Sequence, residues 1–131
     1  MRPRRIFARA NVGTDERGMN KTEAAYAQHL EWGRTVGKIH QWWFEAAKFR
    51  IGPAGGHCWY TPDFKVQLPL GAIEFHECKG FKRRPNGEPG CYIEEDARVK
   101  IKAAAAIYPY RFVLVYKLPL KDGGGWQRED V

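Results

Sequence analysis

The spacing of apolar and polar residues predicts a helix in the first quarter of the chain. Asn20 can cap this helix, and Glu23 stands three residues further on, as in a capping box. The apolar face that shares the direction of Glu23 contains Tyr26, Ala27 and Leu30. A carboxylate on an inward face needs a partner. Glu23 is therefore either a helix cap alone or a cap that also serves a buried site.

Strand patterns follow this helix. Residues 39–51 lead toward a first strand and contain Trp42 and Trp43, which could stack on nucleic-acid bases, although buried packing is commoner for such residues. Alternation from Cys58 to Leu68 then predicts one half-buried strand. Its apolar side carries Tyr60, Phe64, Val66 and Leu68, and its polar side carries Thr61, Asp63, Lys65 and Gln67.

The next strand is predicted from about residue 72 to residue 81. Successive side chains of a strand point to opposite faces. One face carries Ile73, Phe75, Glu77 and Lys79, and the other carries His76 and Cys78. The first face is expected to begin in the core and to end in a charged cleft, and the second to pack under a helix.

The last third of the chain predicts a second helix and a buried strand. Glu94, Glu95 and Asp96 suit a helix N-terminus, because they complement the helix dipole, and Pro109 ends this helix. Residues 112–116 form a continuous apolar run, which is typical of a strand buried on both faces. Such a strand requires helices on both sides of its sheet, so the predicted order is helix, three strands, helix, strand.

Three segments are expected along the chain. Residues 1–19 are a basic, flexible arm whose arginines are either simply solvated or gain phosphate contacts on binding. Residues 20–118 form the single domain that a chain of 131 residues allows. Residues 119–131, which include Gly123–Gly125, are expected to form a flexible tail.

Two acids and a lysine form the most informative chemical group. Asp63 would reach the face of Glu77 and Lys79 from the preceding strand, and two carboxylates brought together repel unless a divalent cation lies between them. Hard oxygen ligands suit Mg2+ or Mn2+. The plainer alternatives are a solvated Asp63 and a surface ion pair between Glu77 and Lys79, which would contribute little.

The segments Pro62-Asp63 and Glu77-Cys78-Lys79 resemble the signature of the PD-(D/E)xK nuclease superfamily. The earlier acid-bearing helix and the later basic helix with its apolar strand extend the resemblance over roughly residues 20 to 117. Within the superfamily the chain looks most like small phage-type nucleases, including Holliday-junction resolvases. The resemblance implies an α/β fold with a restriction-endonuclease-like αβββαβ core, in which helices flank a mixed central sheet.

The same resemblance assigns roles to individual residues. Asp63, Glu77 and the backbone carbonyl of Cys78 would hold Mg2+, which Mn2+ could replace, and Glu23 would complete the metal shell directly or through water. Lys79 would orient or deprotonate the attacking water. The nucleic acid would be contacted by the basic turn after the site and by the second helix, through Lys82, Arg83, Arg84, Arg98, Lys100 and Lys102. A solvated charge run, or pairing within the helix between Glu94 and Arg98, is the alternative.

The predicted function is metal-dependent cleavage of DNA, selective for branched structures such as Holliday junctions. A net charge of +7 favours a polyanionic partner. A general or nicking phage nuclease, a non-catalytic nucleic-acid-binding module on the same fold, and an interaction protein with incidental acids remain alternatives. A homodimer is possible. No apolar run is long enough to cross a bilayer, and the three cysteines read as free thiols, so we expect a cytoplasmic protein without a membrane partner.

Overall fold

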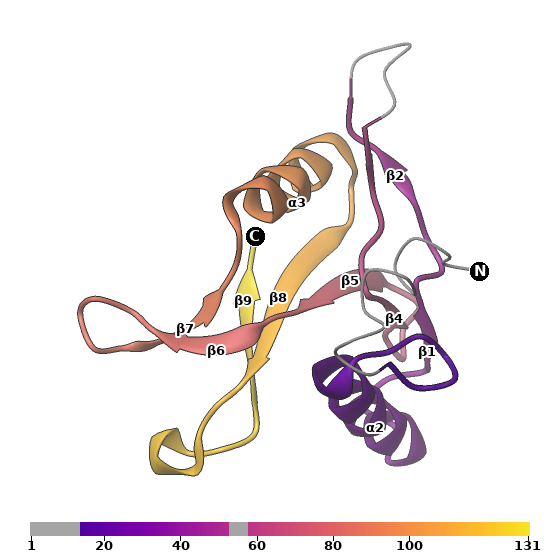
Figure 1. The fold of residues 1–131 in the computed structure, drawn as a ribbon. Coiled ribbons are helices and arrows are strands. Elements are labelled where there is room, and N and C mark those ends of the chain that lie inside the picture. The colour runs from indigo at the N-terminus through magenta and orange to yellow at the C-terminus, as the bar shows by residue number, and fades with distance from the viewer. Residues whose placement is uncertain (1–13, 53–57) are drawn as a thin grey trace.

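A five-stranded central sheet organises the protein. The structure, a computed structural model, describes residues 14–52 and 58–131. The strands of this sheet lie in the order β1 (Gln41–Phe44), β4 (Phe64–Gln67), β5 (Ile73–Cys78), β8 (Arg111–Lys117) and β9 (Trp126–Asp130) (Figure 1). Strands β5 and β8 are parallel, and every other neighbouring pair is antiparallel. The sheet is therefore mixed, as the resemblance implies.

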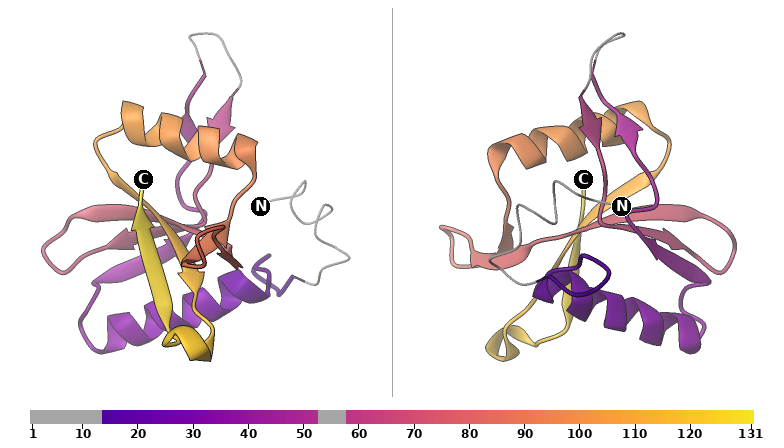
Figure 2. Two further views of the ribbon diagram at one scale, coloured as in Figure 1. Left: turned by 90° about the vertical axis from the view of Figure 1, so that its left-hand side faces the viewer. Right: turned by 45° about the vertical axis from the view of Figure 1, so that its right-hand side comes forward.

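Two short hairpins project from the central sheet. One pairs β2 (Phe49–Arg50) with β3 (Trp59–Tyr60), and the other pairs β6 (Gly80–Arg83) with β7 (Pro89–Tyr92). Figures 1 and 2 show them leaving the sheet in different directions. The second hairpin begins directly after β5 and leads into helix α3, so it connects the central strand to that helix.

Helices α2 (Lys21–Thr35) and α3 (Glu95–Ile107) cover opposite faces of the sheet (Figure 2). The start of α2 is the predicted capping box. The Asn20 side chain accepts a hydrogen bond from the Glu23 amide at 2.8 Å, and the Glu23 carboxylate accepts one from the Asn20 amide at 3.0 Å. Both bonds satisfy amide groups that the helix itself leaves unpaired.

Each helix closes a separate hydrophobic core. Between α2 and the sheet lie Tyr26, Leu30, Phe64, Val66, Val113 and Val115, and between α3 and the sheet lie Phe75, Ile101, Ala104, Phe112 and Leu114. Successive residues of β8 thus enter different cores, and the five residues from Phe112 to Tyr116 are all buried. The prediction of a strand buried on both faces, with helices on both sides, is confirmed.

The strand predicted from Cys58 to Leu68 is interrupted. It is divided into β3, which pairs with β2, and β4, which pairs with β1 and β5. Pro62 lies at the interruption and has no amide hydrogen for a strand ladder. As a result, Tyr60 belongs to the core under α3, whereas Phe64 belongs to the core under α2. The prediction that Tyr60 and Phe64 share one side was wrong.

The C-terminal segment is not a loose tail. It contains a 3-10 helix (Leu120–Asp122) and strand β9, which pairs antiparallel with β8. Residues Gly123–Gly125 all have positive φ, a conformation that glycine adopts without steric cost, and they turn the chain back onto the sheet. Trp126 then packs against the core under α2. Strand β9 covers an edge of β8 that would otherwise be open to other chains.

The predicted N-terminal arm divides at residue 14. Residues 1–13, with most of its arginines, lie outside the described residues. Residues 14–19 are ordered against the domain: the Asp15 carboxylate accepts a hydrogen bond from the Met19 amide at 2.9 Å, and Met19 is buried in the core under α2. The domain therefore begins before residue 20.

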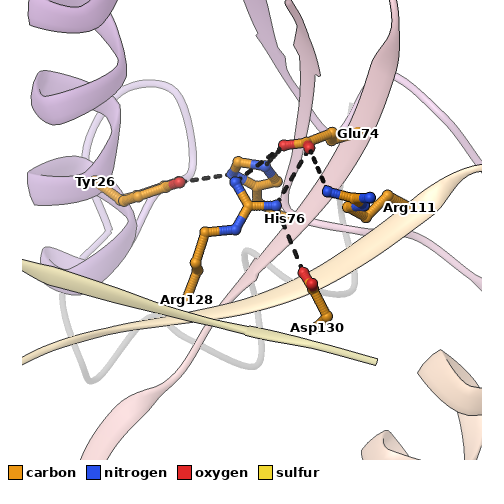
Figure 3. Close-up of polar contacts among 6 residues, drawn as sticks. All are labelled: Tyr26, Glu74, His76, Arg111, Arg128 and Asp130. Atoms are coloured by element: carbon orange, nitrogen blue, oxygen red, sulfur yellow. Dashed lines mark hydrogen bonds and ion pairs between the residues drawn. The ribbon is translucent and has the colours of Figure 1, made fainter.

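A buried polar cluster ties α2, β5 and β9 together (Figure 3). Glu74 and His76 are both buried, and His76 Nε2 lies 2.9 Å from Glu74 Oε1. The Tyr26 hydroxyl lies 2.6 Å from His76 Nδ1. Because a carboxylate only accepts hydrogen bonds, His76 Nε2 carries a proton and donates it to Glu74. Arg128 donates two hydrogen bonds to Glu74, at 3.3 and 3.2 Å.

These contacts stabilise the charged form of Glu74. The hydrogen bond from His76 and those from Arg128 lower the pKa of Glu74 to about 2, against the opposing effect of burial. Arg111 adds a longer ion pair at 3.9 Å. The carboxylate is therefore an ionised group whose charge is compensated inside the fold.

Replacing Glu74 by Gln should lower stability by about 1–3 kcal/mol at pH 7, because the hydrogen bonds lose their charged acceptor. A depressed pKa contributes stability above the unfolded-state value near 4.5, and this contribution is lost as the pH falls toward 2. The deficit of Glu74→Gln should thus shrink between pH 7 and pH 3.5 in urea unfolding experiments. A deficit that is equal at both pH values would contradict the assignment.

Candidate functional site

The antiparallel pairing of β4 and β5 brings Asp63 and Glu77 together. Phe64 lies opposite His76, so the preceding Asp63 falls opposite Glu77, at the end of the ladder. Phe64 and His76 face α2, and the side chains of their neighbours therefore point to the α3 side of the sheet. Asp63 is only 2% exposed, which rules out the plainer alternative of a solvated acid.

The backbone around Cys78 holds Asp63 in position. The Lys79 amide donates to the Val115 carbonyl in β8, so the Cys78 amide, one residue earlier, points toward β4. There the Asp63 carboxylate accepts its hydrogen bond at 2.9 Å. Pro62 stands where the ladder would continue, and it cannot donate a hydrogen bond to the Cys78 carbonyl. The sequence Pro62-Asp63 thus replaces a regular ladder contact with a carboxylate contact.

Glu77 lies between a tyrosine and a lysine. The Tyr60 hydroxyl donates to Glu77 Oε1 at 2.9 Å, and Lys79 Nζ lies 3.4 Å from Oε2. The Glu77 side chain is 14% exposed and that of Lys79 is 22% exposed, so both groups are largely withdrawn from water while remaining accessible. The predicted association of Glu77 with Lys79 is present, but it is a partly buried pair rather than a surface one.

The charge of Glu77 is incompletely compensated. Burial and the negative charge of Asp63 raise the pKa of Glu77 to about 7, although Lys79 and the Tyr60 hydroxyl act in the opposite direction. Glu74, three residues earlier on the same strand, has its pKa lowered to about 2 by its partners. The site on the α3 side therefore has excess negative charge that a cation would relieve.

The donor chemistry of this site fits a hard divalent cation. Two carboxylates in a partly dehydrated position, next to a backbone carbonyl, are the ligand types that Mg2+ and Mn2+ prefer. Within residues 14–52 and 58–131, however, no three side chains of His, Cys, Asp or Glu gather into a metal-binding group. Asp63 and Glu77 would hold such an ion together with the Cys78 carbonyl and water.

Glu23 is buried at the start of α2, the helix on the other face of the sheet from Glu77. One of its carboxylate oxygens takes part in the capping box. The structure thus shows the capping role, and a role at the metal stays a prediction. Among the described residues, the structure does not group Glu23 with Asp63 and Glu77 as three possible metal ligands.

The predicted nucleic-acid contacts differ in availability. Lys82 is exposed on β6, with its ammonium 5.3 Å from the centre of the Tyr92 ring. Arg83 and Arg84 already form ion pairs, with Asp122 at 2.7 Å and Glu129 at 3.1 Å. On α3, Lys102 is exposed, while Arg98 and Lys100 are partly buried. A phosphate would have to displace an acid from either of the hairpin arginines.

Tyr60 is the site residue that sequence analysis missed. Simple alternation assigns it to the same apolar side as Phe64, with a packing role only. In the structure its ring packs in the core under α3, and its hydroxyl orients Glu77. Pro62 was the one local signal that the alternation could not continue through this segment.

No protein-family model matches the sequence, and no curated protein or solved structure matches it. In the part of the chain that the structure describes, neither helix has the length and apolar character needed to cross a membrane.

Replacing Glu77 by Gln should stabilise the protein at pH 8 by on the order of 1 kcal/mol. A raised pKa means that the folded state holds the proton more tightly than the unfolded state, so wild-type stability falls as the pH rises from about 4.5 to about 7. Gln cannot ionise, so the stability of the variant does not fall in this way. Thermal unfolding of both proteins at pH 4.5 and pH 8 measures the difference in stability.

The same substitution at Glu88, which is exposed in the turn between β6 and β7, is the matched control and should change little at either pH. A Glu77→Gln variant that is less stable than wild type at pH 8 would show that Tyr60 and Lys79 fully compensate the acid.

Proposed function

We propose that this protein is a metal-dependent DNA endonuclease of the PD-(D/E)xK type. The observation that carries the proposal is the pair of Asp63 and Glu77 at the end of the central strand, with Lys79 beside it. The two acids lie close enough for the charge of Asp63 to raise the pKa of Glu77. Mutual repulsion of two buried carboxylates lowers the stability of the folded state. Acids with a pKa shifted in this way are concentrated at functional sites.

The order of elements supports the same proposal. Along the chain, α2 precedes three strands of the central sheet, and α3 then precedes β8. This is the αβββαβ order that the resemblance implies, with β9 added at the sheet edge. Glu77 lies on β5, and Asp63 directly precedes β4, the antiparallel neighbour of β5.

Each residue of the site would have a distinct task. Asp63, Glu77 and the Cys78 carbonyl would hold Mg2+ together with water, while Glu23 caps helix α2 on the other face of the sheet. A bound metal ion would polarise the scissile phosphate and lower the pKa of a bound water. The Lys79 ammonium can hold the attacking water or a phosphate oxygen and compensate charge that develops there. Tyr60 keeps the Glu77 carboxylate oriented through its hydrogen bond.

The substrate is proposed to be branched DNA. The net charge of +7 favours a polyanion. Both α-helices in the described residues pack on the central sheet, and neither forms a separate domain that could read a base sequence. We therefore favour selection by DNA shape over selection by base sequence. Lys82 and Lys102 are the exposed members of the predicted contact set. Action in the cytoplasm, as a monomer or a homodimer, fits this substrate.

Purified protein should cut a labelled four-way junction in Mg2+ and leave it intact in EDTA. Asp63→Asn and Lys79→Ala should each reduce the rate by about 100-fold or more, because each removes a charge at the reacting phosphate. Lys117→Ala, which removes an exposed lysine at the end of β8, is the matched control and should retain the wild-type rate. A denaturing gel measures the cleavage rate of each variant on the junction, the linear duplex and the single strand.

The substrates separate the alternatives. Equal cutting of every substrate would indicate a general nuclease, and tight binding without cutting in Mg2+ or Mn2+ would indicate a non-catalytic module. A protein that neither binds nor cuts DNA would refute the proposal.

A further inference from the structure

The tandem tryptophans of β1 have different environments. Trp42 packs against the core under α2, and its indole N–H donates to Glu31 at 2.9 Å. Trp43 points to the other face of the sheet and is 38% exposed. The packing role expected for the pair therefore applies to Trp42, while Trp43 presents a large aromatic surface to solvent.

The sheet register places Trp43 on the same face as the acid pair. Trp43 lies opposite Lys65 in β4, and Lys65 lies opposite Phe75 in β5. Asp63 is two residues before Lys65, and Glu77 is two residues after Phe75. With standard strand spacing, the backbone of Trp43 lies about 12 Å from that of Glu77. This is a short path for an extended nucleic-acid strand.

Lys65 completes a cation and aromatic pair next to the acids. Its ammonium lies 4.8 Å from the centre of the Trp43 ring. Single-stranded nucleic acids are bound by this combination, because the aromatic ring stacks on a base and the cation meets the backbone phosphate. The bases inside a duplex already stack on one another, so an exposed ring stacks most readily on a base that has left the helix.

We propose that Trp43 and Lys65 form a subsite for an unpaired base of the DNA strand that enters the Asp63 and Glu77 site. The proposal rests on the proposed function and specifies its substrate: DNA with a single-stranded segment beside the cut, as at a branch point. Trp43 stacks on the base, and Lys65 contacts the adjoining phosphate.

Fluorescence anisotropy in EDTA tests the subsite without cleavage. The probes are a fluorescein-labelled single strand and the blunt duplex of the same sequence. Trp43→Ala should weaken binding of the single strand by about 5- to 100-fold and binding of the duplex by less than about 2-fold. Trp43→Phe, which retains a ring, should keep most of the affinity, whereas Trp43→Leu, which retains bulk without a ring, should not.

Trp32 provides a matched control. It is 51% exposed on α2, and the Lys38 ammonium lies 4.9 Å from its ring centre. The local chemistry is the same, but the helix is on the other side of the sheet from Glu77. Trp32→Ala should leave the affinity for both probes unchanged. Lys65→Ala should reduce the salt dependence of single-strand binding by about one phosphate contact.

Several outcomes would overturn the subsite. Equal losses for single strand and duplex in Trp43→Ala, equal affinities of the Leu and Phe variants, or an altered oligomeric state with unchanged DNA binding would each do so. The last result would assign Trp43 to a contact between two copies of the chain.

Cleavage assays on the same proteins in Mg2+ separate this proposal from the proposed function. Selective single-strand binding through Trp43 without cleavage would remove the nuclease and retain the subsite. Cleavage that does not depend on Trp43 would support the nuclease and remove the subsite.

Discussion

The central strand β5 places ionisable side chains on both faces of a sheet whose interior is otherwise apolar, and the compensation of their charges governs the structure. Burial penalises an ionised carboxylate unless partners repay the lost hydration. Glu74 has such partners in His76 and Arg128, which lower its pKa to about 2. Glu77 has weaker ones, and its pKa rises to about 7. Two acids of one strand thus differ in pKa direction because their surroundings differ.

The compensated face accounts for much of the architecture. Arg128 reaches Glu74 from β9, and the Tyr26 hydroxyl reaches His76 from α2 (Figure 3). Losing β9 would leave the β8 edge open and would remove the two hydrogen bonds from Arg128 to Glu74. The ion pair and the packing of Trp126 therefore explain why a glycine-rich C-terminal segment becomes an ordered strand.

The incompletely compensated face is where we propose that the chemistry takes place. Asp63, Glu77 and Lys79 are held by backbone contacts of neighbouring strands, and Tyr60 orients the second acid. Asp63 directly precedes β4 and Lys79 directly follows β5, so the sheet fixes their backbone positions, which suits the proposed placement of a metal ion and a phosphate. The negative charge of the acids on this face destabilises the fold, and a bound cation would offset that effect. On the same face of the sheet, Trp43 and Lys65 form an aromatic and positively charged pair.

The sequence by itself determined the features that depend on neighbouring residues. The Asn20 and Glu23 capping box, the apolar run of β8, and the common face of Glu77 and Lys79 arise from interactions within a few positions of the chain. Only the tertiary structure decided that β9 forms, that the strand breaks so that Tyr60 contacts Glu77, and which tryptophan of β1 is exposed. The reason is physical: burial, sheet pairing and pKa depend on groups far apart in sequence, such as Arg128 and Glu74, and local patterns do not specify those encounters.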